Sequence, residues 1–238
     1  FTLKAMDGSS VQLMDTEKNQ LLYPQPSVQK SGCGFPVMGI VGLLNLGHGG
    51  WEHIETCPYT QHDTKAAATL ATHLSEGDLL LADRAFCSYE LIARCRKQAA
   101  HILMRLHHAR DKALDWRKGS KIDSNQRIVT WKRPQRPHGT SLTREQWETL
   151  PETMELRLIR FHHENRAGKK AQLIVVTTLL DAQQHAGEDL ADLYARRWDI
   201  ELKLRDLKTT LGMERFDIKS PDMAHKTLWM SVIAYNLI

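Results

Sequence analysis

The sequence lacks the features that define membrane, disulfide-rich and disordered proteins. Its longest apolar runs, such as Ile174–Val176 and Gly39–Leu44, are far too short to cross a bilayer. Its 4 cysteines are far apart and form no C-x-x-C pair, so we expect reduced, buried thiols in a cytosolic protein. With 42% hydrophobic and 25% charged residues among 238, the composition is that of a globular protein with one large domain or two small ones.

Further absences concern function and location. The chain contains no P-loop, no nucleotide-binding glycine fingerprint and no G-x-S-x-G elbow. No signal peptide is visible, and we expect a cytoplasmic protein without a membrane partner. The first residue is Phe1 rather than Met, so we expect the chain to be part of a longer protein.

The net charge of +4 is spread unevenly along the chain. Residues 105–170 carry 16 Lys and Arg against 8 Asp and Glu, an excess of +8, and the rest of the chain carries 16 against 20, which is −4. A basic middle segment indicates a surface for a polyanion, but a solvated set of arginine-rich β-ribbons without a ligand accounts for the same charges. Charge alone leaves both interpretations open.

Alternation and capping signals predict a mixed sheet with helices packed on it. Strands are expected over residues 1–6, 11–14, 37–46, 78–82, 102–106 and 172–179, with a turn at Asp7-Gly8 after the first. Helices are expected over residues 64–74, 89–97, 188–211 and 222–237, with Asp63 and Ser88 as N-caps and Gly212 as a C-cap. Gly-Ser and Arg-Pro breaks with short β-like pieces indicate an inserted, mostly β subdomain over residues 107–170.

Two carboxylates stand where expected strands end. Asp7 follows the first strand, and Asp83 follows the apolar strand over residues 78–82. A carboxylate at such a point is rigidly held and partly exposed, and the carboxyl ends of strands are where sites form in α/β folds. Taken singly, each residue also has an ordinary explanation as a turn-former or N-cap.

The helix expected over residues 188–211 carries a polar stripe. Tyr194, Arg197, Glu201 and Lys208 fall at about 0°, −60°, −20° and −40° around its axis. The stripe borders the apolar face, so it should lie beside the sheet rather than face bulk water. Salt-bridging charges on an amphipathic helix explain Arg197 and Glu201, but they explain less well an aromatic hydroxyl and a distant lysine on the same line.

Such a set of residues fits phosphoryl transfer on a nucleic-acid backbone. Carboxylates are the ligands that Mg²⁺ prefers, and two ions about 4 Å apart activate the attacking oxygen and stabilise the leaving one. Arg197 and Lys208 would bind phosphate, and Tyr194 would donate a hydrogen bond to one.

The spacing of Tyr194, Arg197, Glu201 and Lys208 resembles the Y-R-E-K signature of the DDE transposases of bacterial insertion sequences, the family numbered four. The segment Met6-Asp7-Gly8-Ser9 is similar to the region of that family's first catalytic Asp. The segment Leu81-Ala82-Asp83-Arg84-Ala85-Phe86 is similar to its second, where the family often has Gly at the position of Ala85.

The resemblance implies a ribonuclease-H-like α/β fold, a mixed sheet flanked by helices with a mostly β insertion before the Glu-bearing helix. It implies that Asp7, Asp83 and Glu201 are the catalytic, metal-binding residues, holding Mg²⁺ or Mn²⁺, two ions in all. It also implies that DNA-binding residues Tyr194, Arg197 and Lys208 contact transposon-end phosphates, and that strands are cut by water and then joined by the freed 3′-hydroxyl.

The same resemblance divides the chain into core residues 1–106, an insertion over residues 107–171 and core residues 172–238. The expected partners are double-stranded DNA, as transposon ends and target, and a second copy in a synaptic homodimer at the bacterial nucleoid. Some members stack a flipped base on an insertion tryptophan, but for Trp116, Trp131 and Trp147 a buried structural role is expected. A related nuclease or resolvase that cuts without joining, and an inactive DNA-binding fragment, remain alternatives.

Overall fold

The computed structural model describes residues 1–28, 30, 32–59, 63–164, 170–210, 212 and 214–237. The chain divides into two compact units. Unit 1 comprises Phe1–Lys4 and Ala71–Arg197, and unit 2 comprises Ala5–Leu70 and Trp198–Ile238. Strand β1 (Thr2–Leu13) begins in unit 1 and continues in unit 2.

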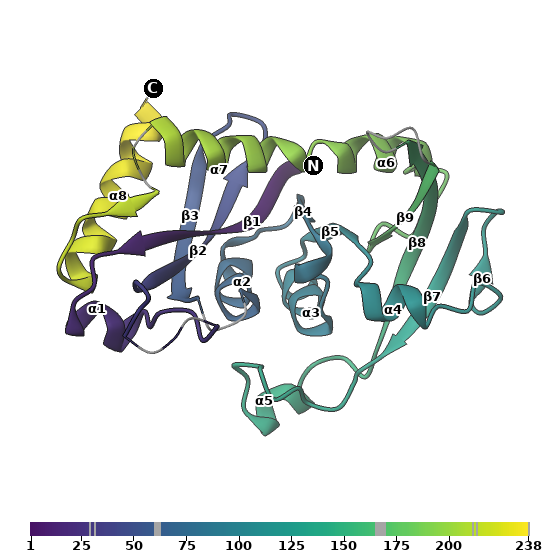
Figure 1. Cartoon of the computed structure of the whole chain (residues 1–238). Coiled ribbons are helices and arrows are strands. Elements are labelled where there is room, and N and C mark those ends of the chain that lie inside the picture. Colours follow the sequence, from purple (N-terminus) through teal and green to yellow (C-terminus); the bar gives the residue numbers. More distant parts are fainter. Residues whose placement is uncertain are drawn as a thin grey trace. The chain divides into compact units, whose positions relative to one another are not determined.

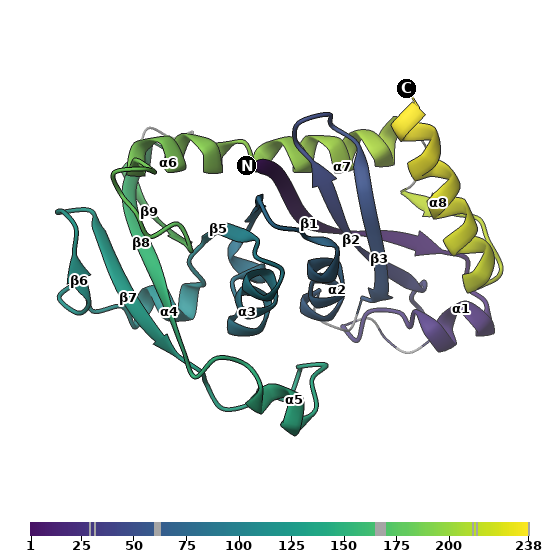
Figure 2. The ribbon, with the colours of Figure 1, turned by 180° about the vertical axis from the view of Figure 1, so that it is seen from behind.

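Unit 2 is a small sheet with four helices among its described residues. Its strands follow the order β3 (Trp51–Pro58), β2 (Val37–Asn45), β1, and β10 (Arg215–Phe216) pairs in parallel with the end of β1. Its helices are α1 (Glu17–Leu22), α2 (Thr64–Leu70), α7 (Trp198–Thr210) and α8 (Pro221–Leu237). Figures 1 and 2 show β1, β2 and β3 side by side from opposite faces.

Helix α8 is tied to this sheet by polar side chains at both of its ends. The Asn236 side chain accepts from the Trp51 backbone N–H at 2.9 Å and donates to the Trp51 carbonyl at 2.8 Å. Near the start of the helix, His225 Nε2 lies 3.0 Å from the Thr56 hydroxyl. Strand β3 therefore sets the position of α8 through specific bonds as well as through packing.

Unit 1 contains a longer mixed sheet. Its strands follow the order β4 (Asp78–Ala82), β5 (His101–Arg105), β9 (Lys170–Thr177), β8 (Thr153–Glu164), β7 (Gln126–Lys132), β6 (Ser120–Lys121). Strands β4 and β5 are parallel and the later pairs are antiparallel. The helical elements are α3 (Tyr89–Lys97), α4 (His108–Lys112), α5 (Arg144–Glu148), α6 (Gly187–Ala195) and the 3₁₀ turns η1 (Ala71–His73) and η2 (Arg84–Phe86).

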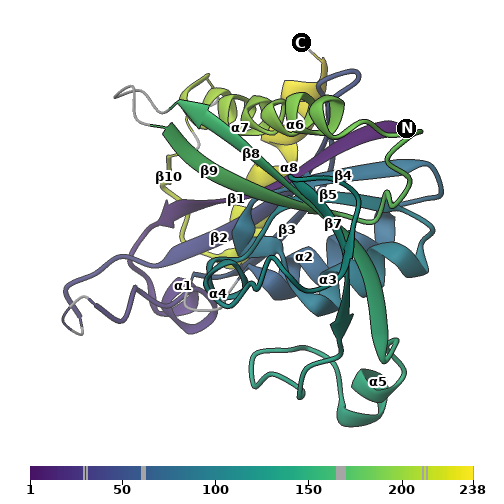
Figure 3. The ribbon, with the colours of Figure 1, turned by 90° about the vertical axis from the view of Figure 1, so that its right-hand side faces the viewer.

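The core of unit 1 follows from the apolar runs of the sequence. Strand β4 is buried along its whole length, and the predicted cap of α3 is confirmed, since Ser88 Oγ accepts from the Leu91 N–H at 3.2 Å. Lys4 and Asp78 form a nearly buried ion pair at 3.0 Å. Figure 3 shows β7, β8 and β9 side by side, and the segment that carries α5 extends from β7 and β8.

The predicted fold class is confirmed. The sheet mixes parallel and antiparallel pairs, carries helices and is consistent with a ribonuclease-H-like core. Residues 107–171, the predicted insertion, supply β6, β7, β8 and the start of β9, and the division at residues 106 and 171 stays a prediction. Within the described ranges, no helix is both long and apolar enough to span a bilayer.

The predicted turn at Asp7-Gly8 is wrong, because β1 runs through both residues as one strand. Hydrogen bonds to neighbouring strands outweigh the local turn preference of the Asp-Gly pair. Gly8 serves a different purpose there. A Cβ atom on Gly8 would lie 2.8 Å from Asp63 Oδ2, so the glycine lets the Asp63 carboxylate approach the strand.

The continuous helix predicted over residues 188–211 is also wrong. Helix α6 ends at Ala195 and α7 begins at Trp198. Between them, the N–H groups of Arg196 and Arg197 donate to the carbonyls of Leu193 and Tyr194, three residues back instead of four. The polar stripe is therefore divided, with Tyr194 on α6 and Glu201 on α7.

Local signals also missed several short elements. Strand β3 and helices α1, α4 and α5 were not predicted. The predicted burial of tryptophans is confirmed for Trp131 and Trp147, whereas Trp116 is half-exposed. Buried thiols are confirmed for Cys57, Cys87 and Cys95, and Cys33 is exposed.

The contact between Gly42 on β2 and the Trp51 ring on β3 gives a stability prediction. A Cβ atom on Gly42 would meet the ring edge, coming within 2.9 Å of Cε3. We expect Gly42→Ala to lower the unfolding free energy by about 1–3 kcal/mol, because the buried ring has no room to move. Urea unfolding followed by tryptophan fluorescence measures the loss.

Gly139→Ala is the matched control, because no heavy atom lies within 4 Å of the added Cβ position. We expect its unfolding midpoint to stay near that of the wild type. Equal midpoints for both variants would contradict the predicted clash.

Candidate active site

The carboxyl ends of β4 and β5 form the edge on which the candidate site of unit 1 is built. The two strands are parallel, and Ala82 is paired with Met104. The next residues along the strands, Asp83 and Arg105, therefore stand beside each other at one edge of the sheet. Asp83 is half-buried and lies exactly one residue beyond β4, as the sequence predicted.

Tyr194, on α6, reaches the same edge. Its hydroxyl donates to the Ala82 carbonyl at 3.4 Å, and the side chain is buried. Burial raises the pKa of Tyr194 to about 12, with Arg197 and Arg105 opposing the rise and Asp83 adding to it. The phenol therefore stays protonated at neutral pH and is a hydrogen-bond donor.

Arg197 completes this cluster from the segment that follows α6. Its guanidinium carbon lies 5.9 Å from the centre of the Tyr194 ring, and the residue is buried. Unit 1 thus brings together Asp83, Arg105, Tyr194 and Arg197. The sequence analysis did not select Arg105. A signal for it was present, since Arg105 is the last residue of an apolar strand and Asp83 directly follows another.

The fully buried side chain of Arg157, on β8, positions the start of α6. Its guanidinium donates to the His185 carbonyl at 2.7 Å, to the Asp181 carbonyl at 3.3 Å and, through Nε, to Gln126 Oε1 at 3.0 Å. A Cβ atom on Gly187, the first residue of α6, would lie 2.8 Å from the Gln126 side chain. The sequence analysis did not predict this network, because an arginine in a strand of alternating polar and apolar residues is normally expected on the exposed face.

Unit 2 holds the other predicted residues. Asp7 lies within β1, half-buried, and its Oδ1 accepts from the Gly8 N–H at 2.8 Å. Glu201 and Lys208 lie seven residues apart on α7, on one face. Both are half-buried beside the core residues Ile200, Leu204 and Leu207, which agrees with the predicted place of this part of the stripe.

The surroundings of Lys208 keep part of its side chain from water. Burial lowers the pKa of Lys208, and the nearby Glu214 carboxylate opposes that change. A lysine with reduced hydration loses less solvation on meeting an anion. This position suits a phosphate contact, but the contact stays a prediction.

The three predicted metal ligands are divided between the units. Asp83 belongs to unit 1, and Asp7 and Glu201 belong to unit 2. Among the residues that the structure describes, no three His, Cys, Asp or Glu side chains form a cluster able to hold a metal ion. The triad therefore stays a prediction from the sequence.

Comparisons with known proteins agree with the sequence motifs. The family model described as "Transposase DDE domain" matches residues 3–237. The chain is 24% identical over 244 residues to the transposase InsG for insertion sequence element IS4 of Escherichia coli (strain K12), an alignment that covers 100% of this chain and 51% of that protein. It is 31% identical over 65 residues to the transposase for insertion sequence element IS421 of Escherichia coli, covering 27% of this chain and 18% of that protein. The chain thus spans about half the length of the first of these relatives.

The raised pKa of Tyr194 gives a pH-dependent prediction. Because its pKa is about 12 in the folded chain and about 10 when unfolded, the stabilisation is complete below pH 10 and is lost as pH rises to about 12. We expect wild-type stability to fall relative to Tyr194→Phe by about 2 kcal/mol across that range. Urea unfolding at a series of alkaline pH values measures the difference.

Tyr59→Phe is the control for this measurement, because Tyr59 is an exposed tyrosine. Its stability should follow that of the wild type at every pH. Parallel curves for the wild type and Tyr194→Phe would contradict the prediction.

Proposed function

Because this chain belongs to the DDE transposase domain family, we propose that it carries the catalytic centre for metal-dependent DNA strand cleavage and strand transfer. In this proposal Asp7, Asp83 and Glu201 act as the catalytic carboxylates. Double-stranded DNA is the substrate, as transposon ends and as target, and two copies act together in the synaptic complex. Residues 107–171 form an insertion into the core.

The state of the Asp83 carboxylate is the observation that supports this proposal best. Asp83 stands at the N-cap position of η2, yet its side chain makes no capping hydrogen bond. It also forms no ion pair or hydrogen bond with another described residue, although a half-buried carboxylate at a strand end normally finds a donor. The Asp83 carboxylate is thus available as an acceptor at the carboxyl ends of β4 and β5, which favours a ligand-binding role over a structural one.

The donor chemistry of the proposed triad suits a hard cation. Three carboxylates offer oxygen ligands, the type that Mg²⁺ and Mn²⁺ prefer, and we assign the metal to Asp7, Asp83 and Glu201 on that ground. When bound, such an ion supplies positive charge beside the scissile phosphate.

Arg197, Lys208 and Tyr194 act on the DNA backbone in this proposal. In this proposal the protonated Tyr194 phenol exchanges its long, 3.4 Å bond to the Ala82 carbonyl for one to a phosphate oxygen, and the Arg197 guanidinium adds positive charge. Arg105 adds a second guanidinium at the same edge of unit 1. In this arrangement the three donors orient a phosphate next to Asp83, and the two guanidinium groups offset the negative charge of the phosphate.

Each carboxylate of the proposed triad can be removed by an isosteric amide. We expect Asp7→Asn, Asp83→Asn and Glu201→Gln each to reduce Mg²⁺-dependent nicking of supercoiled plasmid by at least about 100-fold, because an amide cannot replace a charged ligand. Gel separation of nicked from supercoiled DNA measures the rate, and circular dichroism checks the fold.

Asp206→Asn on α7 is the matched control, since it removes one carboxylate from the helix that carries Glu201. It should nick at the wild-type rate. Wild-type rates in any of the three triad variants would remove that residue from the proposal. A pre-cut substrate with a free 3′-hydroxyl separates a transposase, which joins it to target DNA, from a nuclease or resolvase, which does not.

Lys208 is the proposed phosphate contact on α7. We expect Lys208→Ala to weaken duplex binding and to make the slope of log K against log salt shallower by about 1, the value for one lost phosphate contact. Fluorescence anisotropy with a labelled duplex measures both quantities. Lys219→Ala, which removes an exposed lysine of the same unit, should leave the slope unchanged, and equal slopes in all three proteins would count against the phosphate contact.

A further inference from the structure

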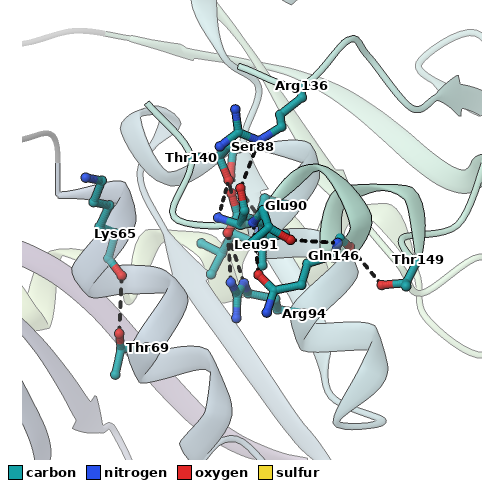
Figure 4. Close-up of polar contacts among 12 residues, drawn as sticks. Lys65, Thr69, Ser88, Glu90, Leu91, Arg94, Arg136, Thr140, Gln146 and Thr149 are labelled. Carbon is teal, nitrogen blue, oxygen red and sulfur yellow. Dashed lines mark hydrogen bonds and ion pairs between the residues drawn. The ribbon is translucent and has the colours of Figure 1, made fainter. Parts of the chain in front are cut away.

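A groove in unit 1 lies between the last turn of α3 and the segment that carries α5. Its volume is about 620 Å³. Arg94, Arg96 and Lys97 line it from α3, and Leu142, Leu150 and Pro151 line it from the other side. Figure 4 shows part of both walls, with Arg94 on one and Gln146 and Thr149 on the other. Among the described lining residues there are three cations and no carboxylate.

Specific hydrogen bonds hold the two walls in place. The Tyr89 hydroxyl, at the start of α3, donates to the Pro151 carbonyl at 2.7 Å. The Thr140 hydroxyl donates to Glu90 Oε2 at 2.6 Å (Figure 4). Helix α5 is itself closed by a capping box between Thr143 and Gln146. The groove is therefore formed before any ligand arrives.

The carboxylate of Glu90, which is bonded to Arg94, is already occupied. Glu90 Oε1 accepts from Arg94 Nε at 3.1 Å and from Arg94 Nη2 at 2.9 Å, while its Oε2 accepts from Thr140. Arg94 keeps Nη1 without a partner among the described residues. The side chains of Arg96 and Lys97 are exposed and likewise bond to no described side chain. The groove thus presents a net positive charge with donors to spare.

Basic residues in the last turn of a helix also complement the helix dipole. That effect accounts for cations near Gln98, the C-cap of α3, but it does not require them to line a preformed groove. The opposite wall is mostly apolar, with Leu142, Leu150 and Pro151 beside the polar Gln146 and Thr149. Cations on one wall and apolar groups on the other match a sugar–phosphate backbone, whose phosphates alternate with deoxyribose, better than they match a small free anion.

We propose that the groove between α3 and α5 binds the backbone of duplex DNA, as a contact surface separate from the carboxylate centre. Arg96 and Lys97 pair with phosphates, Arg94 is held by Glu90 to offer Nη1, and Leu142 and Leu150 contact sugar. This assignment rests on the proposed function for its ligand class. It adds a surface that neither the Y-R-E-K spacing nor the three carboxylates includes.

The first experiment removes the two exposed cations. Arg96→Ala combined with Lys97→Ala should weaken binding of a labelled duplex about tenfold at 0.1 M salt and make the slope of log K against log salt shallower by about 2, one for each phosphate contact. The matched control is Lys18→Ala combined with Lys65→Ala, which removes the same charge from exposed helical positions of unit 2.

The outcomes separate this proposal from the one it rests on. A loss confined to the α3 variant supports the groove. Equal effects of the two double variants would reduce the result to net charge and overturn the groove alone. If the wild-type chain binds no duplex, both DNA binding and the groove are overturned. If the α3 variant binds duplex and nicks plasmid as the wild type does, the groove is overturned and the catalytic proposal stands.

A second experiment does not depend on charge. In a Cys33→Ser background, Thr149→Cys is labelled with a photo-crosslinker and irradiated with duplex DNA. Burial raises the pKa of Cys57 and of Cys87 to about 11 and that of Cys95 to about 12, so these thiols should stay unlabelled. The control is Thr69→Cys on α2, an exposed threonine that also donates to a helix carbonyl, as Thr149 does (Figure 4). Crosslinking from position 149 above that from position 69 supports the groove, and equal yields would overturn it.

Discussion

The candidate site of unit 1 depends on one buried cation. Arg157 has no exposed surface, and its guanidinium is surrounded by neutral acceptors, the Gln126 amide oxygen and the carbonyls of the segment that leads into α6. A buried charge without such acceptors would cost several kcal/mol, so the segment that supplies them has little freedom to follow another path. Helix α6 therefore starts at a defined place beside β7 and β8. Tyr194, near its end, reaches the carboxyl end of β4.

The edge that Tyr194 reaches combines opposite charges. Asp83 offers an acceptor, while Arg105 and Arg197 supply positive charge around a phenol that burial keeps protonated. A phosphate bound next to a metal ion requires both kinds of group. Its oxygens accept hydrogen bonds from donors such as arginine, whereas the metal ion requires anionic ligands such as aspartate. The chain belongs to the DDE transposase domain family, and the proposed function assigns this arrangement to binding of a DNA phosphate. The other two carboxylates of the proposed triad, Asp7 on β1 and Glu201 on α7, belong to unit 2.

Sequence reasoning succeeded where one element is bounded by its own residues. Ser88 caps α3, and the apolar run over residues 78–82 is a buried strand. It failed where distant parts of the chain compete with a local preference. The Asp7-Gly8 pair favours a turn by itself, but neighbouring strands hold it extended, and the glycine makes room for Asp63. The helix over residues 188–211 has a continuous pattern, yet Arg196 and Arg197 bond three residues back and end α6.

By itself, the sequence determined the family, through the spacing of Tyr194, Arg197, Glu201 and Lys208, because that spacing is a property of local intervals. Only the tertiary structure decided that Arg105 stands beside Asp83, that Arg157 is buried and that α3 and α5 enclose a basic groove. Each of these depends on strand register or on loops that meet across many residues. Register is set by the whole set of pairing and packing contacts, and no short segment of sequence encodes it.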